Sequence, residues 1–219
     1  MTSPIRAIVF DLDGVLIDSE QVWNQVREDL ARERGGRWSE SAQRDMMGMS
    51  SPEWSRYMHE VVGVAGSPEE INHEVVARML DRFAQSPPWF PGATEAVQRL
   101  AVHWPLGLAS SSNRELIDAV LAAGGIAGLF GATVSSEEVA RGKPAPDVYL
   151  ETARRLRVAP AECTAIEDSH NGILSAKAAG MRCVAIPNEH YPPGAVKDAA
   201  DAVVGGLGEL TLAVLRGPR

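Results

Sequence analysis

Two aspartates stand one residue apart at the end of an apolar, largely β-branched segment. Residues 5–10 predict a buried strand, and Asp11 and Asp13 follow it directly. Carboxylates this close repel each other unless a cation lies between them or one is protonated. An isolated Asp-x-Asp pair usually marks a surface turn. Directly after a buried strand, the pair instead favours phosphoryl chemistry at a magnesium ion, with one carboxylate attacking phosphorus and the other moving protons.

A run of serines ends a second apolar segment, residues 105–109. The hydroxyls of Ser110 and Ser111 and the backbone N–H groups that follow can donate to a phosphate oxygen. Helix capping is the alternative role, and it suits Ser112 or Asn113. Because Ser110 is nearest the strand, we expect it to be the better phosphate ligand.

Acidic residues follow a third apolar segment, residues 164–166. Asp168 offers a further carboxylate for a divalent cation, and Glu167 could support that cation from behind or through water. His170 could act as an acid or base. A histidine near a helix start is more often a cap or a surface contact, however, and Asp13 already supplies the proton-transfer group.

A lysine stands between residues that break regular structure. Gly142 and Pro144 flank Lys143, and a helix is predicted to begin at Pro146 or Asp147. An isolated lysine is usually a solvated surface charge. Fixed in this segment, Lys143 could neutralise a phosphate and shield the attacking carboxylate.

Helical patterns alternate with the apolar segments. They lie at residues 94–102, 114–122, 146–156 and 172–179. Alternating strands and helices predict an α/β fold whose core is a Rossmann-like parallel sheet covered on both faces. In such sheets ligands bind at the carboxyl ends of the strands, where the polar residues above stand.

One stretch near the N-terminus breaks the alternation. Its amphipathic segments lie at residues 22–33, 42–47, 53–62 and 69–83. We therefore predict a helical-bundle cap at residues 19–90, inserted into a core formed by residues 1–18 and 91–219. The proline-rich segment 86–92 marks the return to the core, and the tail 201–215 is predicted to add a strand and a helix.

Composition limits the partners of the chain. A net charge of −8 over 219 residues disfavours sequence-independent binding to nucleic acid or to an anionic membrane. The N-terminus does not resemble a signal peptide, and no apolar run reaches the roughly 18 residues of a membrane span. We expect a cytoplasmic monomer with a small-molecule phosphate as its partner. Cys163 and Cys183 lie in short apolar runs typical of free buried thiols.

The polar strand ends together resemble the four motifs of the haloacid dehalogenase superfamily of phosphotransferases. The resemblance covers nearly the whole chain, and the combination is specific although no single motif is. The matching residues, in motif order, are Asp11-Leu12-Asp13-Gly14-Val15, Ser110, Lys143 and Glu167-Asp168.

The resemblance implies a role for each of these residues. Asp11 would be the nucleophile and a magnesium ligand, and Asp13 the general acid and base and a metal ligand through its carbonyl. Asp168 would supply the remaining metal carboxylate. Ser110 and Lys143 would hold the transferring phosphoryl group. The expected activity is magnesium-dependent hydrolysis of a small organic phosphate, such as a sugar phosphate, through an aspartyl-phosphate intermediate.

Longer segments resemble the β-phosphoglucomutase and sugar-phosphate phosphatase group. Mutases of this group carry a cap histidine and a cap arginine where Trp23 and Ser51 stand here. The missing cationic contact favours hydrolysis, with a phosphomutase as the alternative. Arg44, Arg56 or His59 could supply the missing charge. A phosphorylation-dependent signalling module is a weaker alternative, because it needs only about 120 residues and no helical insert.

A loop of the helical insert is the predicted specificity surface, together with two tryptophans. These residues are Gly48, Met49, Ser50, Ser51, Trp23 and Trp54. Methionines and tryptophans at helical spacing are more often core residues. Exposed to the substrate, an indole face could stack on a sugar ring.

Overall fold

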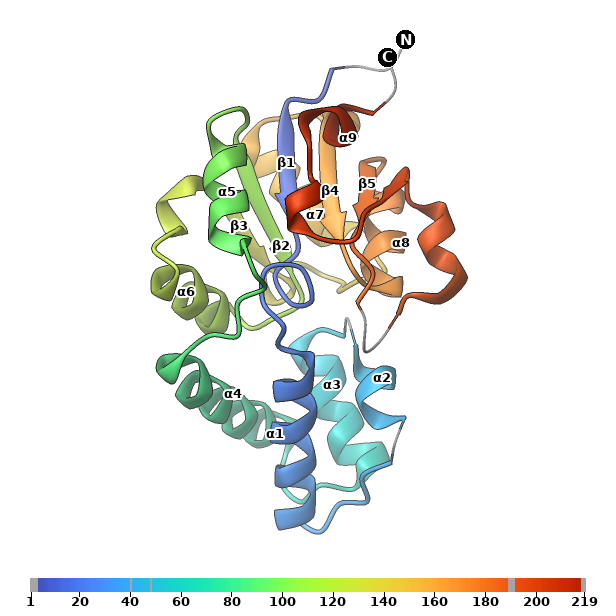
Figure 1. The fold of residues 1–219 in the computed structure, drawn as a ribbon. Coiled ribbons are helices and arrows are strands. Elements are labelled where there is room, and N and C mark those ends of the chain that lie inside the picture. Colours follow the sequence, from blue (N-terminus) through green and yellow to red (C-terminus); the bar gives the residue numbers. More distant parts are fainter. Residues whose placement is uncertain (1–3, 40, 48, 189–191, 218–219) are drawn as a thin grey trace.

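A parallel sheet forms the centre of the computed structural model, which describes residues 4–39, 41–47, 49–188 and 192–217. Its strands are β1 (Ala7–Phe10), β2 (Leu106–Ser110), β3 (Phe130–Ser135), β4 (Cys163–Glu167), β5 (Arg182–Ala185) and β6 (Ala202–Val203). The six strands are ordered β3-β2-β1-β4-β5-β6, and every neighbouring pair is parallel (Figure 1). The predicted α/β fold class is confirmed.

Helices cover both faces of this sheet. They are α5 (Ala93–Ala101), α6 (Arg114–Ala123), α7 (Asp147–Leu156), α8 (His170–Ala178) and α9 (Leu212–Arg216). Ile8 and Phe10 of β1 belong to one apolar cluster with α5, α6 and α9. Ala7 and Val9, which point the other way along the strand, belong to a second cluster with α7 and α8. Burial on both faces explains why β1 is apolar at every position.

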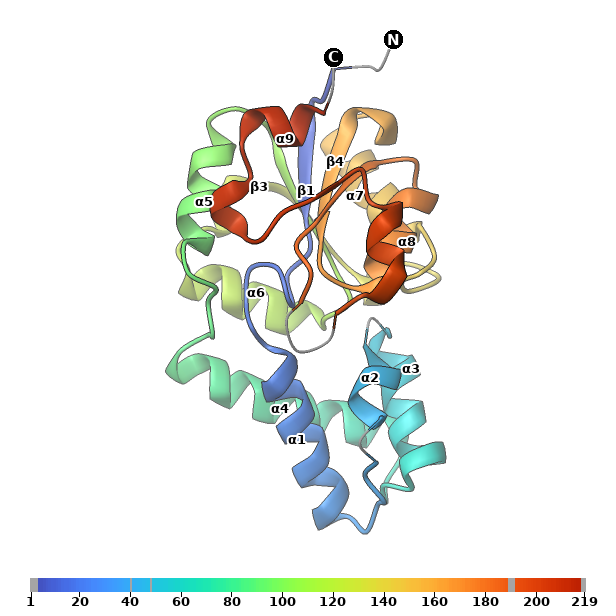
Figure 2. The ribbon, with the colours of Figure 1, turned by 45° about the vertical axis from the view of Figure 1, so that its right-hand side comes forward.

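Four further helices lie beyond the carboxyl ends of the strands (Figures 1 and 2). They are α1 (Glu20–Glu33), α2 (Ala42–Met46), α3 (Ser51–Tyr57), which continues into a π-helical turn at Met58–Val62, and α4 (Pro68–Gln85). Each follows one of the amphipathic segments of the sequence. The chain enters and leaves this bundle side by side, since Asp18 N donates to Pro88 O at 2.7 Å and Phe90 N to Leu16 O at 3.0 Å.

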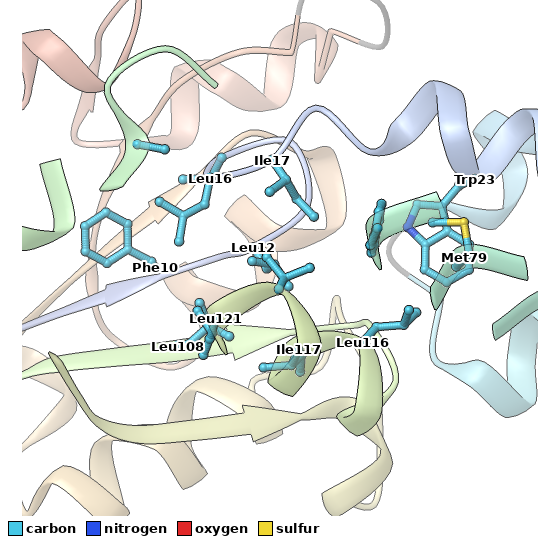
Figure 3. Packing of buried hydrophobic residues seen from close by; sticks show 14 of the residues in the cluster. Phe10, Leu12, Leu16, Ile17, Trp23, Met79, Leu108, Leu116, Ile117 and Leu121 are labelled. Atoms are coloured by element: carbon cyan, nitrogen blue, oxygen red, sulfur yellow. The ribbon is translucent and has the colours of Figure 1, made fainter. Parts of the chain in front are cut away.

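Apolar packing continues from the sheet into the bundle. Figure 3 labels Phe10 and Leu108 of the sheet, Leu12 and Ile17 of the turn after β1, and Trp23 and Met79 of α1 and α4, which all belong to one apolar cluster. The bundle therefore packs directly against the strand ends. The division into a core and a cap domain stays a prediction.

The sequence did not predict β3, because its residues Phe130–Ser135 include a glycine and a threonine and form no continuous apolar run. Cys163 and Cys183 are free and buried, as predicted. Within the described ranges, every helix is too short or too polar to cross a membrane.

Candidate active site

The first aspartates stand on a tight turn at the end of β1. Asp11 N donates to Ile166 O at 3.0 Å, which holds the residue at the sheet edge, and Gly14 N donates to Ile17 O at 2.8 Å. Gly14 has φ +80°, and a Cβ there would lie 2.0 Å from Oδ2 of Asp168. Only glycine permits both the backbone conformation and this close approach. The turn therefore brings the first and fourth motifs together.

Lys143 reaches into the site from the loop before α7. Its Nζ lies 2.8 Å from Oδ1 of Asp11 and 2.5 Å from Oε1 of Glu167, and its side chain is 2% exposed. Burial opposes its charge, but Asp11 and Glu167 overcome that effect and raise the pKa of Lys143 above its ordinary value. Lys143 is thus a fixed buried cation, not a solvated surface charge.

Glu167 is held on all sides by donors. Tyr149 donates its hydroxyl to Oε1 at 2.7 Å, while Oε2 accepts from the backbone N–H of Asp168 at 3.1 Å and from the Ser169 hydroxyl at 3.2 Å. A Cβ at Gly172 would lie 1.9 Å from the carboxylate. Glu167 accordingly positions Lys143, and its predicted support of the metal stays a prediction.

Asp168 has no such partners. It is buried, and neither of its carboxylate oxygens accepts a hydrogen bond from any residue that the structure describes. Ligand atoms of Asp11, Glu167 and Asp168 lie within 4.8 Å of one another. Burial raises the pKa of Asp11 to about 8 and that of Asp168 well above its ordinary value. Three buried carboxylates carry more negative charge than the single lysine beside them can neutralise. A divalent cation such as Mg²⁺ would supply the missing positive charge.

Asp13 points away from this cluster, toward the bundle. Its Oδ1 accepts from the Ser19 hydroxyl at 2.5 Å and from Trp23 Nε1 at 3.0 Å. Its Oδ2 accepts from the Ser112 hydroxyl at 2.6 Å and from Ser110 at 3.4 Å. The two aspartates of the first motif thus have separate environments, as their predicted roles require.

The serine loop after β2 is fixed by the end of β3. Ser135 donates its hydroxyl to Ser112 O at 2.6 Å, and Ser136 donates to Ser111 O at 3.0 Å. Ser111 and Ser112 line the cavity above the carboxylates, whereas Ser110 is fully buried and its Oγ accepts from the Ser112 N–H. Its predicted contact with phosphate stays a prediction, and Ser112 is a cavity residue that the sequence assigned only to capping.

A cavity of about 50 Å³ separates the strand ends from the bundle. Its lining is Asp11, Asp13, Ser111, Ser112, Lys143, Asp168 and Ser169 on one side and Glu20, Trp23, Arg27, Met46, Met47, Met49 and Trp54 on the other. Three predicted specificity residues, Trp23, Trp54 and Met49, line it. Ser50 caps α3 with Glu53 and lies elsewhere, as does Ser51, and Gly48 falls outside the described residues.

The cation on the bundle side of the cavity is Arg27, which the sequence analysis missed. The candidates Arg44, Arg56 and His59 do not line the cavity, and His170 is exposed outside it. Helical spacing could have revealed Arg27, because Glu20, Trp23 and Arg27 are three and four residues apart and share one face of α1. Arg27 matters because the sequence analysis argued against a phosphomutase from the lack of such a cationic contact.

Burial also shifts the pKa values of two ionisable residues on this side of the cavity, Glu20 and Arg27. Burial, followed by the charge of Asp13, raises the pKa of Glu20 to about 7. Burial lowers the pKa of Arg27 to about 10, although Glu20 and Asp13 oppose that shift. Both groups are therefore held out of water on the wall that faces the carboxylates.

Comparison with known proteins identifies the family. The sequence model for haloacid dehalogenase-like hydrolases matches residues 5–180. The chain belongs to this family. This hydrolase is 34% identical to hexitol phosphatase B of Escherichia coli K12, an alignment that covers 99% of this chain and 100% of the relative. Its membership and its relatives make it a phosphoric monoester hydrolase.

Solved structures agree on the fold of this hydrolase. CbbY of Rhodobacter sphaeroides, in complex with xylulose-1,5-bisphosphate, has a TM-score of 0.84 at 24% identity, covering 97% of this chain and 100% of that one. A β-phosphoglucomutase from Clostridium difficile has a TM-score of 0.82 at 24% identity, covering 95% and 94%. At this identity the likeness shows the fold alone.

Proposed function

We propose that the chain is a magnesium-dependent phosphatase that hydrolyses a small sugar-type phosphate through an aspartyl phosphate on Asp11. One observation carries the proposal. The buried carboxylate of Asp11 is held by Lys143 on one side and faces the unpartnered carboxylate of Asp168 on the other. This arrangement suits a nucleophile beside a divalent cation.

Asp11 and Asp13 divide the work of the two half-reactions. An oxygen of Asp11 forms a bond to phosphorus as the bond to the leaving oxygen breaks, and Asp13 gives its proton to that oxygen. Asp13 then takes a proton from water as the water oxygen attacks phosphorus and releases Asp11. The donors from Ser19, Trp23 and Ser112 hold Asp13 on the bundle side of the cavity, where the leaving group would lie.

Positive charge must compensate the phosphate. Lys143 lies beside Asp11, favours its ionised form and can donate to a phosphoryl oxygen. When bound, Mg²⁺ would neutralise further charge on the phosphoryl group, held by Asp11, Asp168 and the carbonyl of Asp13. The N–H groups and hydroxyls of Ser111 and Ser112 would complete the phosphate site.

The bundle of α1–α4 would act as a cap. A cavity of about 50 Å³ holds only a few water molecules, whereas small-molecule sites usually measure about 300–1,000 Å³. Polar contacts across the boundary include Asn113 Nδ2 to Asn72 Oδ1 at 3.2 Å and Asn171 Nδ2 to Met47 O at 3.1 Å. These hydrogen bonds can break at modest cost. We expect the cap to open for substrate and to close over it.

A phosphomutase is the second candidate, because Arg27 supplies the cap cation that the sequence analysis did not find. Likeness to a full-length relative named hexitol phosphatase supports hydrolysis, while the β-phosphoglucomutase structure shares the fold. The two reactions give different products, free phosphate in one and an isomeric phosphate in the other.

Phosphate release tests the proposal. We would incubate the native chain, Asp11→Asn and the control Asp118→Asn with Mg²⁺ and a panel of hexitol, aldose and glycerol phosphates. Asp118 is a suitable control because its side chain is 63% exposed. We expect release by the native chain and the control, none by Asp11→Asn, and none in excess chelator. Release by Asp11→Asn, or isomeric products without free phosphate, would contradict the proposal.

A further inference from the structure

Arg27 is an unusual residue in the cap. It is 5% exposed, and its guanidinium carbon lies 4.4 Å from the ring centroid of Trp23 and 4.7 Å from that of Trp54. The two indoles, whose centroids are 6.0 Å apart at 60°, hold the planar group in place. The guanidinium thus occupies one face of each indole.

The guanidinium has few partners of its own. Nη1 donates to Gln43 Oε1 at 3.2 Å, while Nε is buried without an acceptor among the described residues. Nor does any described carboxylate lie within 4.0 Å of it, in contrast to the paired arginines on the surface. A buried charge without a counter-ion is costly unless a ligand completes its hydrogen bonds.

Gln43 links Arg27 to an acceptor. Its Nε2 donates to Glu20 Oε2 at 2.9 Å, and Glu20 is 8% exposed on the same cavity wall. Arg27, Gln43 and Glu20 therefore form one buried network with donors at one end and a carboxylate at the other. A hydroxyl group both donates and accepts, so adjacent hydroxyls match such a network.

The balance of charge decides between ligands. In the proposed function Mg²⁺ and Lys143 would compensate Asp11 and Asp168, so Arg27 is the cation that remains beside the acidic residues Asp13 and Glu20 of the cavity lining. After the transferred phosphate has been accommodated, a second anionic group would lie beside Glu20 and be repelled. The apolar walls supplied by the neighbouring methionines suit the C–H groups of a carbon chain.

We propose that Arg27 and Glu20, which Gln43 links, bind the hydroxyl groups of an uncharged polyhydroxy leaving group, and that Arg27 determines specificity for it. The inference deepens the proposed function and rests on it. It selects phosphate monoesters of sugars or alditols over bisphosphates and over esters without hydroxyl groups.

The test compares leaving groups in one enzyme. We would measure kcat/KM with Mg²⁺ for a hexitol monophosphate, a ketose bisphosphate and para-nitrophenyl phosphate, whose leaving group carries no further hydroxyl. The variants are Arg27→Met, Arg27→Lys and the control Arg32→Met, since Arg32 is on the same helix with its side chain 68% exposed. Arg27→Lys keeps the positive charge beside the indoles and carries the test if the methionine variant fails to fold.

Selective loss is the expected result. Losing hydrogen bonds from a charged donor should lower kcat/KM of Arg27→Met for the hexitol phosphate roughly 10- to 100-fold. Its kcat/KM for para-nitrophenyl phosphate should stay near the native value, and Arg32→Met should match the native enzyme throughout. The lysine variant should show the same selectivity with a smaller loss.

Three results would overturn the inference, and they differ from one another. Equal losses on the hexitol and nitrophenyl esters would make Arg27 a purely structural residue. A preference for the bisphosphate that Arg27→Met abolishes would make the subsite an anion site. Native enzyme that releases no phosphate from any of the three compounds would refute the proposed function and this inference with it.

Discussion

Replacing Lys143 by methionine removes the cation that lies between two buried carboxylates. Methionine keeps an unbranched apolar chain, so the main change is electrostatic. In the variant, Asp11 loses a partner at 2.8 Å and Glu167 a partner at 2.5 Å, both with side chains at most 8% exposed. The two acids then face each other without compensation.

The loss of unfolding free energy in Lys143→Met can be judged from the burial of the ion pair. Breaking a buried ion pair by removing one partner costs roughly 3–5 kcal/mol of unfolding free energy. For a chain of this size, each kcal/mol shifts Tm by about 2–4 °C, so Tm should fall by about 6–20 °C. The surface pair of Lys177 with Asp201, at 2.7 Å, gives the matched control. Lys177→Met should cost at most about 1 kcal/mol.

Thermal unfolding and steady-state kinetics separate the two roles of Lys143. Adding Glu167→Gln to Lys143→Met removes the stranded charge while Tyr149 can still donate to the amide oxygen, so part of the lost Tm should return. Phosphatase activity should not return, because the phosphate still lacks its lysine. The reasoning is refuted if Lys143→Met melts like the native chain, or if the double variant is no more stable than the single one.

Further variants and conditions probe the surroundings. Unfolding free energy should fall as pH rises from about 9 to about 11, because burial raises the pKa of Cys163 to about 11 and only the folded chain keeps that proton; denaturant titrations in which Cys163→Ala has the same pH slope would contradict this. Trp23→Phe removes an N–H donor to a carboxylate and should lower kcat roughly tenfold in steady-state assays; an unchanged kcat argues against that contact. Gly172→Ala should lower Tm, because its Cβ would lie 1.9 Å from Glu167, whereas Gly208→Ala meets no atom within 4 Å and should not; equal melting of the two variants would exclude the clash.

The polar strand ends of the candidate site were predictable because their signals are local. An apolar strand followed at once by Asp11 and Asp13 is visible in a dozen residues, and the parallel sheet then brings Asp168 to the same edge. The partners of Lys143 were not predictable from its neighbours, because they lie 132 and 24 residues away. Only the tertiary structure converts that lysine from a surface charge into a buried cation.

The helical bundle shows the same limit of sequence-based prediction. Helices α1–α4 could be placed from amphipathic spacing, but which face of α1 turns toward the strand ends depends on packing between helices. Arg27 was therefore overlooked, although Glu20 and Trp23 share its face. Similarly, β3 was missed because its buried positions alternate with Gly131 and Thr133, so the strand has no continuous apolar run.

The covalent intermediate is the most direct test of the account. We would mix Asp13→Asn with Mg²⁺ and para-nitrophenyl phosphate, quench with acid and analyse the peptides by mass spectrometry. Nitrophenolate leaves without a proton, whereas hydrolysis of the phosphoenzyme needs the base that Asp13 supplies, so the intermediate should accumulate. The account predicts one phosphoryl group on Asp11. Nitrophenolate release with no phosphorylated Asp11 would contradict it.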